Sequence, residues 1–259
     1  MIIGNKNFSG YTYIMAIINL TPDSFYAPSR TSADEVLFRV ERAIKDGAAV
    51  IDLGAQSTRP GYGEIPPDKE ISRLEKPLYE IKKNFDIPVS VDTYSEKTAR
   101  FSLELGADMI NDIWGLSKDG NMAETIARFN ASVCIMHNAE KPVQGDIWAG
   151  VLPFLRRQAT LAVSSGIAKD KIILDGGVGF AKNISQNFEI AENSDKIQAL
   201  GYPALVGVSR KSMFGGRVED RLSGTLKITE ICAKKRILFV RVHDIAQNAE
   251  VIKRVYEEG

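Results

Sequence analysis

The sequence predicts an α/β fold, a single (β/α)8 TIM barrel with a short N-terminal extension, in which residues 1–259 form one domain. Three observations favour this fold. Eight short apolar or β-branched runs recur along the chain, longer segments with helical spacing separate most of them, and 259 residues suit one barrel. An open, doubly wound sheet is disfavoured, because such sheets usually have fewer strands and no GxGxxG turn follows the first run.

The eight runs are the candidate strands, and each is short enough to cross a barrel once. In chain order they are Tyr11–Ile18, Ala48–Leu53, Ile87–Val91, Asp108–Asn111, Ser132–Met136, Ile172–Leu174, Ala204–Val208 and Ile237–Val242. Strands that alternate with helices pair in parallel, because each crossover returns the chain to the same edge.

The segments between the strands carry apolar residues three and four positions apart, which is typical of amphipathic helices. The clearest are Asp34–Asp46, Glu96–Leu105, Ala123–Phe129 and Asn187–Ala199. Two polar segments that contain proline predict longer loops, Ser57–Lys69 and Asn138–Gly145. The residues before Tyr11 predict a small turn or hairpin beneath the barrel.

The charge balance excludes whole classes of partner. Lys plus Arg equals Asp plus Glu at 33 each, so no overall basic field draws the chain onto nucleic acid or an anionic membrane. The first 15 residues lack the pattern of a signal peptide, and no apolar run approaches the roughly 20 residues of a membrane span. Cys134 and Cys232 suggest neither a disulfide framework nor a zinc site, and we expect reduced, buried thiols in a cytoplasmic protein.

Polar residues stand at or directly after the end of every predicted strand, where barrel enzymes place their catalytic groups. They are Asn19, Asp52, Asp92, Asn111, His137, Asp175, Ser209 with Arg210 and Lys211, and His243. A helix-capping role explains any single one of them. Eight in succession, including both histidines of the chain, predict a shared ligand site at one mouth of the barrel.

The types of these groups narrow the ligand. Carboxylates and an amide at Asp92, Asn111 and Asp175 can pair with the edge of a nitrogen heterocycle, while Lys211 donates to its carbonyl, which predicts a pterin-like ring. Positive charge around the same mouth predicts an anionic substituent, and comes from Arg59, Arg210, Lys211, Arg241 and His243. Asn19 and Asp52 are weak candidates for Mg²⁺, which we expect to bind mostly through phosphates of the ligand.

Eight strings follow one another along the chain: NLTPDSF from Asn19, IDLGAQSTRPG from Ile51, SVDTY from Ser90, INDIWG from Ile110, LDGGVGF from Leu174, VGVSRKSMFG from Val206, RLSGTL from Arg221 and VRVHD from Val240. The strings and their order resemble the signatures of the dihydropteroate synthases. The resemblance extends from about Met15 to Asp244. The combination of STRPG, SRKS and RVHD is far more specific than any single string.

The resemblance implies a transferase that condenses 6-hydroxymethyl-7,8-dihydropterin pyrophosphate with p-aminobenzoate in folate biosynthesis. It assigns the pterin edge to Asp92, Asn111, Asp175 and Lys211. It assigns the pyrophosphate and Mg²⁺ to Asn19, Arg241 and His243. Around p-aminobenzoate, where sulfonamides are expected to compete, it places Thr58, Arg59, Phe180 and Ser212, with Pro60 beside them. It also implies a homodimer formed through outer helices, for which Ile228–Lys235 offers an apolar face.

The chain departs from the family pattern at three places. Tyr26–Ser29 replace small Asp- and Gly-containing residues, Ala55 and Gln56 replace Gly-Glu, and Gly176 replaces a proline. Two other functions are kept open. One is a methyltetrahydrofolate-binding methyltransferase, which shares the pterin-binding barrel; the other is a non-catalytic pterin-binding barrel, which the altered first loop and Gln56 would suit. STRPG and SRKS argue against the first, and the retained charges of Arg241 and His243 argue against the second.

Overall fold

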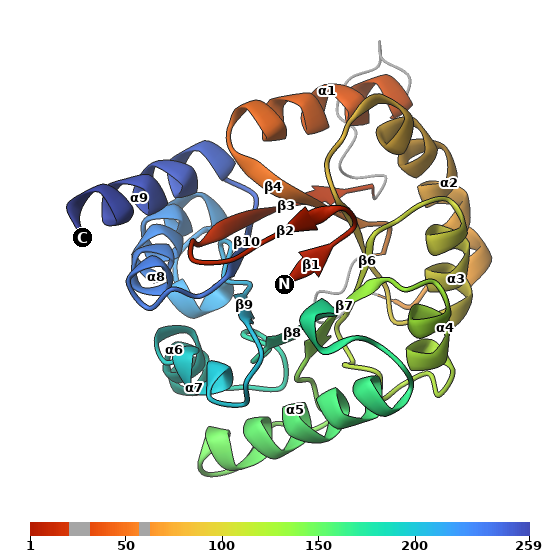
Figure 1. The fold of residues 1–259 in the computed structure, drawn as a ribbon. Coiled ribbons are helices and arrows are strands. Elements are labelled where there is room, and N and C mark those ends of the chain that lie inside the picture. Colours follow the sequence, from red (N-terminus) through yellow and green to blue (C-terminus); the bar gives the residue numbers. More distant parts are fainter. Residues whose placement is uncertain (21–31, 57–62) are drawn as a thin grey trace.

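A computed structural model describes residues 1–20, 32–56 and 63–259 of the chain. Eight parallel strands close into a barrel in the order β10-β3-β4-β5-β6-β7-β8-β9, and helices surround it (Figure 1). The strands are β3 (Tyr13–Asn19), β4 (Ala48–Gly54), β5 (Val89–Asp92), β6 (Met109–Asp112), β7 (Ser132–Met136), β8 (Ile172–Asp175), β9 (Ala204–Val206) and β10 (Phe239–Val242). The predicted barrel and all eight predicted strands are confirmed, and no strand end differs by more than two residues from its predicted position.

The helices on the outside of the barrel are α1 (Ser32–Lys45), α2 (Pro67–Asn84), α3 (Glu96–Glu104), α4 (Met122–Arg128), α5 (Ile147–Ser164), α6 (Ile184–Glu192), α7 (Asp195–Gln198), α8 (Leu222–Lys234) and α9 (Ile245–Glu258). The helix predicted over Asn187–Ala199 is wrong as one element, because the chain leaves α6 at Asn193 and restarts as α7. The loop predicted to run to Lys69 ends earlier, because Pro67 suits the first turn of α2. No helix in the described ranges is both long and apolar enough to cross a membrane.

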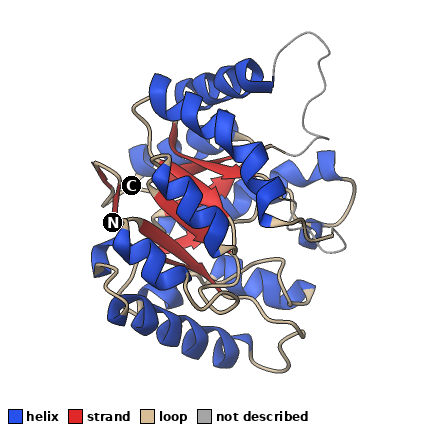
Figure 2. Cartoon of the chain, turned by 90° about the vertical axis from the view of Figure 1, so that its right-hand side faces the viewer, coloured by secondary structure: helices blue, strands red, loops and turns tan. Residues whose placement is uncertain are grey.

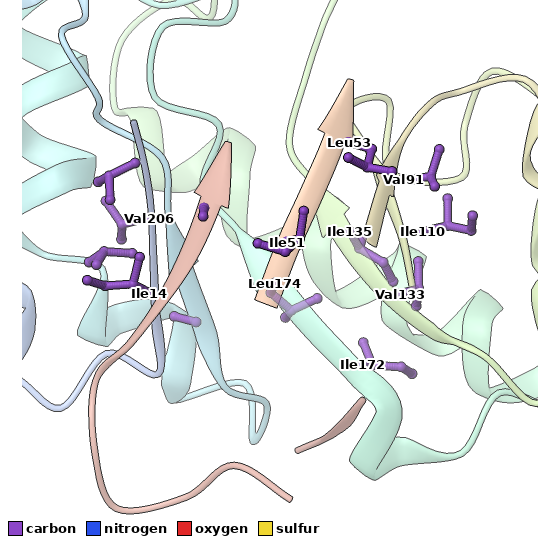
Figure 3. Close-up of a cluster of buried hydrophobic side chains, with 14 of the residues drawn as sticks. Ile14, Ile51, Leu53, Val91, Ile110, Val133, Ile135, Ile172, Leu174 and Val206 are labelled. Carbon is purple, nitrogen blue, oxygen red and sulfur yellow. The ribbon is translucent and has the colours of Figure 1, made fainter. Parts of the chain in front are cut away.

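Side chains alternate across each strand, so every strand has one face toward the helices and one toward the barrel interior. The outward face is apolar and packs beneath the helices (Figure 3), through residues such as Ile51, Leu53, Val91, Ile110, Val133, Ile135, Leu174 and Val206. The inward face begins with an apolar layer at the amino ends of the strands, made of Met15, Val50, Met109, Cys134, Ile173, Leu205 and Phe239.

The N-terminal extension closes the floor of the barrel. It forms a short antiparallel hairpin of β1 (Ile2–Ile3) and β2 (Lys6–Asn7), as predicted. Ile3 and Phe8 are buried against the apolar layer, and the rings of Phe8 and Phe239 lie edge to face with centroids 5.1 Å apart. Figure 2 shows the hairpin at one end of the barrel, with the strand arrows pointing away from it. The carboxyl ends of the strands therefore form the opposite mouth.

Two residues further along each strand, the same inward face turns polar. Val50 is followed by Asp52, Met109 by Asn111, Ile173 by Asp175 and Phe239 by Arg241. The polar region continues onto β5, because Asp92 pairs with Gly54 of β4 on one side and with Asn111 of β6 on the other. The fold thus places a ring of polar groups inside the barrel, just above an apolar floor.

The apolar face expected to serve a dimer is used within the chain. Ile228, Cys232 and Ala233 of α8 are almost fully buried against the barrel, so this face is not available to a second copy and that expectation is wrong. Cys134 lies in β7, and both cysteines are free and buried, as predicted.

Candidate active site

The strongest interactions at the barrel mouth join one arginine to two aspartates. Arg241 Nε donates to Asp52 Oδ2 at 2.5 Å, and Arg241 Nη2 donates to Asp92 Oδ2 at 2.7 Å. Asn111 Nδ2 also donates to Asp52 Oδ2, at 3.3 Å. We call these four residues the carboxylate–arginine cluster. The Asp52 side chain is 0% exposed and that of Asp92 is 7% exposed, so water does not screen the charges.

The cluster leaves some of its acceptors without a partner. Asp52 Oδ1, Asp92 Oδ1 and Ser90 Oγ are buried and make no hydrogen bond to any described residue. Buried polar atoms in folded proteins almost always have a hydrogen-bond partner, because an unmet one costs about 1–3 kcal/mol. These atoms are therefore ready to accept hydrogen bonds from a ligand in the barrel mouth.

Burial shifts the protonation of the acidic groups. It raises the pKa of Asp92 above the ordinary value, the positive charge of Arg241 opposes that rise, and the negative charge of Asp52 adds to it. The pKa of Asp175 is also raised by burial, while the backbone N–H of Gly177, which donates to Asp175 Oδ1 at 2.8 Å, lowers it. Both carboxyl groups consequently respond to pH over a higher range than an exposed aspartate.

Lys211 approaches the cluster from the loop after β9. Burial lowers the pKa of Lys211 to about 8, against the opposing effect of Asp175. Its ammonium donates to the Val178 carbonyl and lies 4.7 Å from the centroid of the Phe180 ring. Gly207 lies between Asp175 and Arg241 on this side of the mouth. A Cβ at this position would lie 3.8 Å from Asp175 Oδ2 and 3.9 Å from Arg241 Cβ.

A second polar group lies beside the first at the ends of β3 and β10. Asn19 Nδ2 is 3.5 Å from His243 Nε2, and His243 Nδ1 is 2.8 Å from Ser209 Oγ. Ser209 Oγ also accepts from the backbone N–H of His243 at 3.1 Å. Asn19 and Asp92 flank Gly54, where a Cβ would lie 3.3 Å from Asn19 Oδ1 and 4.0 Å from Asp92 Cβ. The two groups of polar residues therefore form one continuous mouth.

A cavity of about 670 Å³ opens next to the mouth, between the loops that follow β8 and β9. Ser212 and Met213 line one side, and Gly179, Lys182, Asn183 and Asn187 line the other. The cavity does not include the carboxylate–arginine cluster. We assign the chemistry to the cluster, because its charges and unpartnered acceptors are buried, and we treat the cavity as adjoining space for a second ligand.

Comparison with known proteins now identifies the family. The family of pterin binding enzymes matches residues 15–243. The chain belongs to this family. A dihydropteroate synthase of Clostridium beijerinckii is 42% identical over 98% of this chain and 97% of its own length. The dihydropteroate synthase of Clostridium difficile, solved in the presence of pteroic acid, superposes with a TM-score of 0.93 at 38% identity and covers 98% of both chains. That of Xanthomonas albilineans, solved with 4-aminobenzoic acid, gives a TM-score of 0.91 at 29% identity over 96% of this chain and 93% of the other. Family membership makes this chain a transferase of the dihydropteroate synthase type.

The structure brings most of the predicted site residues together at the mouth of the barrel. Asn19, Asp52, Asp92, Asn111, Asp175, Lys211, Arg241 and His243 all lie at the mouth, with Phe180 and Ser212 beside it. Thr58, Arg59 and Pro60 lie outside the described residues, as do Tyr26–Ser29. Ser209 was named among the strand-end residues without a role of its own, and Ser90 was not predicted as a site residue. The alternation within SVDTY could have found Ser90, since it stands two residues before Asp92 on the same face.

Two strand-end residues of the original set do not face the mouth. His137 is 4% exposed and lies behind the loop after β8, with Nδ1 3.0 Å from Lys182 Nζ. Arg210 donates from Nε and Nη2 to the two carboxylate oxygens of Asp244, at 2.8 and 2.7 Å, so its charge is neutralised there. The expectation that Arg210 adds positive charge for the ligand is therefore wrong.

Two departures from the family pattern have a structural reason. Gln56 Nε2 donates to Tyr94 Oη at 3.0 Å, so the amide joins the loops after β4 and β5. At Gly176, a Cβ would lie only 2.5 Å from Ile190 Cγ2 of α6, so the helix packs against a position without a side chain. Neither departure removes a group from the carboxylate–arginine cluster.

Proposed function

We propose that this chain condenses 6-hydroxymethyl-7,8-dihydropterin pyrophosphate with p-aminobenzoate, giving 7,8-dihydropteroate and pyrophosphate. The observation that carries the proposal is the pair of buried carboxylate oxygens at Asp52 and Asp92 that lack a partner in the described chain. They lie at the mouth where barrel enzymes bind their substrates. The pterin-binding family and its full-length relatives supply the ligand class that fits them.

The ring edge of the pterin binds in the carboxylate–arginine cluster. Its amidine-like N–H groups donate to Asp92, and Asp175 on the facing strand accepts from the remaining ring nitrogens. Asn111, held by Asp52, presents its amide to the same edge. Lys211 donates to the ring carbonyl, since its ammonium reaches the mouth from the loop after β9.

The pyrophosphate extends from the ring toward Asn19 and His243, which lie together beside the cluster. Arg241 lies in the cluster, where it pairs with Asp52 and Asp92, and supplies positive charge for the departing oxygens. No three His, Cys, Asp or Glu side chains gather as a metal site in residues 1–20, 32–56 and 63–259. Mg²⁺ fits this arrangement nonetheless, because it is often held by one or two protein oxygens and by substrate phosphates. Asn19 would hold it, and bound Mg²⁺ would neutralise negative charge on the pyrophosphate.

The reaction breaks the carbon–oxygen bond between the pterin methylene and pyrophosphate, and forms a carbon–nitrogen bond to the arylamine. The arylamine is a modest nucleophile, so stretching the carbon–oxygen bond first lowers the barrier. Positive charge then spreads from the methylene into the ring, where the carboxylates of Asp92 and Asp175 stabilise it. The amine finally loses a proton to the departing pyrophosphate. No protein nucleophile takes part, and Cys134 is unsuited to one because burial raises the pKa of its thiol.

The p-aminobenzoate lies beside the ring, between Phe180 and Ser212, where the 670 Å³ cavity adjoins the mouth. Thr58, Arg59 and Pro60 are proposed to complete this pocket. Sulfonamides, which mimic p-aminobenzoate, should then compete with the amine and not with the pterin. We further propose a cytoplasmic homodimer, whose interface must use surfaces other than the buried face of α8.

The experiment that tests the proposal is pyrophosphate release by the purified protein, given the pterin pyrophosphate and Mg²⁺ with and without p-aminobenzoate. Release that requires the amine and collapses in an Asp175→Asn variant supports the reaction and the role of Asp175 at the ring edge. Tight pterin binding without release would contradict catalysis and favour a non-catalytic binder.

A further inference from the structure

The loop between β8 and α6, residues 176–183, carries Phe180 and holds Lys211, and it is attached to the barrel by a lysine that the reaction does not use. Lys182 turns back from the end of the loop toward β7. Its Nζ donates to the Phe180 carbonyl at 2.8 Å and to the His137 carbonyl at 3.5 Å, and lies 3.0 Å from His137 Nδ1. One amine thus joins the loop to the end of the neighbouring strand.

The contacts of Lys182 are those of a positioning group and not of an ion pair. In the part of the chain that the structure describes, Lys182 forms no ion pair. The pKa of Lys182 is lowered to about 7, mainly by burial; the negative charge of Asp175 opposes this fall, and the positive charge of Lys211 contributes to it. Burial of an ammonium group costs free energy, which its hydrogen bonds to two carbonyl oxygens and its contact with an imidazole offset. These contacts hold the loop and the end of β7 in place.

The loop has little freedom to compensate if Lys182 is removed. Gly177 has φ of +72°, and a Cβ there would lie 1.9 Å from the His137 carbonyl oxygen and 3.2 Å from Lys182 Nζ. Ala181 adopts the left-handed region, with φ of 49°, directly between Phe180 and Lys182. This strained turn is what points Lys182 back at β7, so loss of its contacts allows the turn to relax.

Relaxation of the turn would move the groups that line the amine pocket. Phe180 precedes Ala181, and its ring lies under the Lys211 ammonium at 4.7 Å. Gly179 has φ of +86°, and a Cβ there would lie 2.9 Å from Lys211 Cδ, so loop and lysine are in close contact. A shift of the loop therefore reaches the pocket side of Lys211 directly.

We propose that Lys182 is a positioning residue for the arylamine: by fixing the loop after β8 to His137, it sets the place of the Phe180 ring. The inference rests on the proposed function, and deepens it, because nothing in the ring-edge or leaving-group chemistry requires this lysine. Its loss should weaken arylamine binding while the pterin edge keeps its contacts with Asp92 and Asn111.

The test compares Lys182→Met, which keeps most of the side-chain stem but loses the N–H donors, with Lys141→Met, an exposed lysine in the loop after β7. We expect Lys182→Met to raise KM for p-aminobenzoate about tenfold, the effect of losing roughly one charge-assisted hydrogen bond. We expect kcat and the Kd of 6-hydroxymethylpterin to change by less than about twofold, on the same reasoning. Lys182→Arg, which keeps donors, should recover most of the affinity. Lys141→Met should behave as wild type.

A second measurement does not depend on turnover. The chain has two histidines, so the imidazole of His137 can be followed by NMR. Burial and the charge of Lys182 lower the pKa of His137 to about 4, and Lys182→Met should raise it. If the wild type makes no product, the Kd of p-aminobenzoate is measured instead of KM, by calorimetry in the presence of 6-hydroxymethylpterin and pyrophosphate. A wild type that makes no product would count against the proposed function, but not against the positioning role of Lys182.

Four results would overturn the positioning role. An unchanged His137 pKa in Lys182→Met would show that the contact is absent. A shifted His137 pKa with unchanged amine affinity would show a contact that positions nothing. An equal loss of pterin and amine affinity, or a variant that does not fold while Lys182→Arg folds and binds the amine poorly, would show a general structural role.

Discussion

Replacing Asp92 with asparagine tests the ring-edge contact most sharply, because the change alters acceptors without altering size. Asp92 offers one oxygen without a partner in the described chain and one shared with Arg241. Asparagine removes the charge and turns one acceptor into an N–H donor that faces the donors of the ring. Two charge-assisted hydrogen bonds are lost, each worth about 1.5–3 kcal/mol. The Kd of the pterin pyrophosphate should therefore rise by at least about a hundredfold.

The fold should tolerate this substitution better than most losses of a buried charge. Arg241 keeps its 2.5 Å bond to Asp52, so no arginine is left without a counter-ion. Removal of Asp92 also relieves the repulsion between two buried carboxylates, which offsets the lost ion pair. We expect the free energy of unfolding to change by no more than about 1 kcal/mol.

Isothermal titration calorimetry of 6-hydroxymethyl-7,8-dihydropterin pyrophosphate measures the first quantity, and urea denaturation the second. Asp86→Asn is the matched control, since that carboxylate is exposed at 77% and pairs with Lys6 on the floor hairpin. A fall in affinity of less than about tenfold, with stability unchanged, would refute the assignment of Asp92 to the ring edge. Severe destabilisation would refute the reasoning about Arg241.

Three further expectations concern charge and strain. Asp52→Asn removes a negative charge that raises the pKa of Asp92, so the pKa of Asp92 should fall. Because the carboxylate form of Asp92 binds the ring, pterin binding should then be lost at a lower pH than in the wild type. A shift of this loss to higher pH in calorimetric titrations would contradict the prediction. Burial raises the pKa of Glu70, so the folded state binds protons more readily than the unfolded state and loses stability as pH rises through that range. The stability of Glu70→Gln relative to wild type should therefore increase as pH rises, since the amide does not ionise. Equal pH dependence of the urea midpoints of the two proteins would refute this. Ala181→Gly should raise the free energy of unfolding by about 1 kcal/mol, because an alanine at φ of 49° is strained and glycine is not; thermal unfolding at an unchanged or lower Tm would count against that strain.

The barrel could be predicted because its strands and helices follow from local patterns. The strand ends also located Asp92, Asn111 and Asp175, since parallel strands present their carboxyl ends at one mouth. Period-two alternation explains why these residues point inward above an apolar floor. Such inferences need only the backbone.

Features that depend on side chains from distant segments could not be predicted. The pairing of Arg241 with Asp52 spans 189 positions of the chain, and no local pattern encodes it. His137 stands at a strand end like the others, yet the loop after β8 covers it, because Gly177 lets that loop approach closely. Likewise, nothing in the sequence of α8 shows that its apolar face is taken by the barrel.

The most direct test of the central claim is to count products. The purified protein is incubated with the pterin pyrophosphate, p-aminobenzoate and Mg²⁺, and both 7,8-dihydropteroate and pyrophosphate are quantified over time by mass spectrometry and a coupled phosphate assay. Condensation yields equal amounts of the two products, and we expect none of either when the amine is omitted. Pyrophosphate without dihydropteroate would show hydrolysis instead of condensation, and would contradict the proposed arrangement of ring, amine and leaving group.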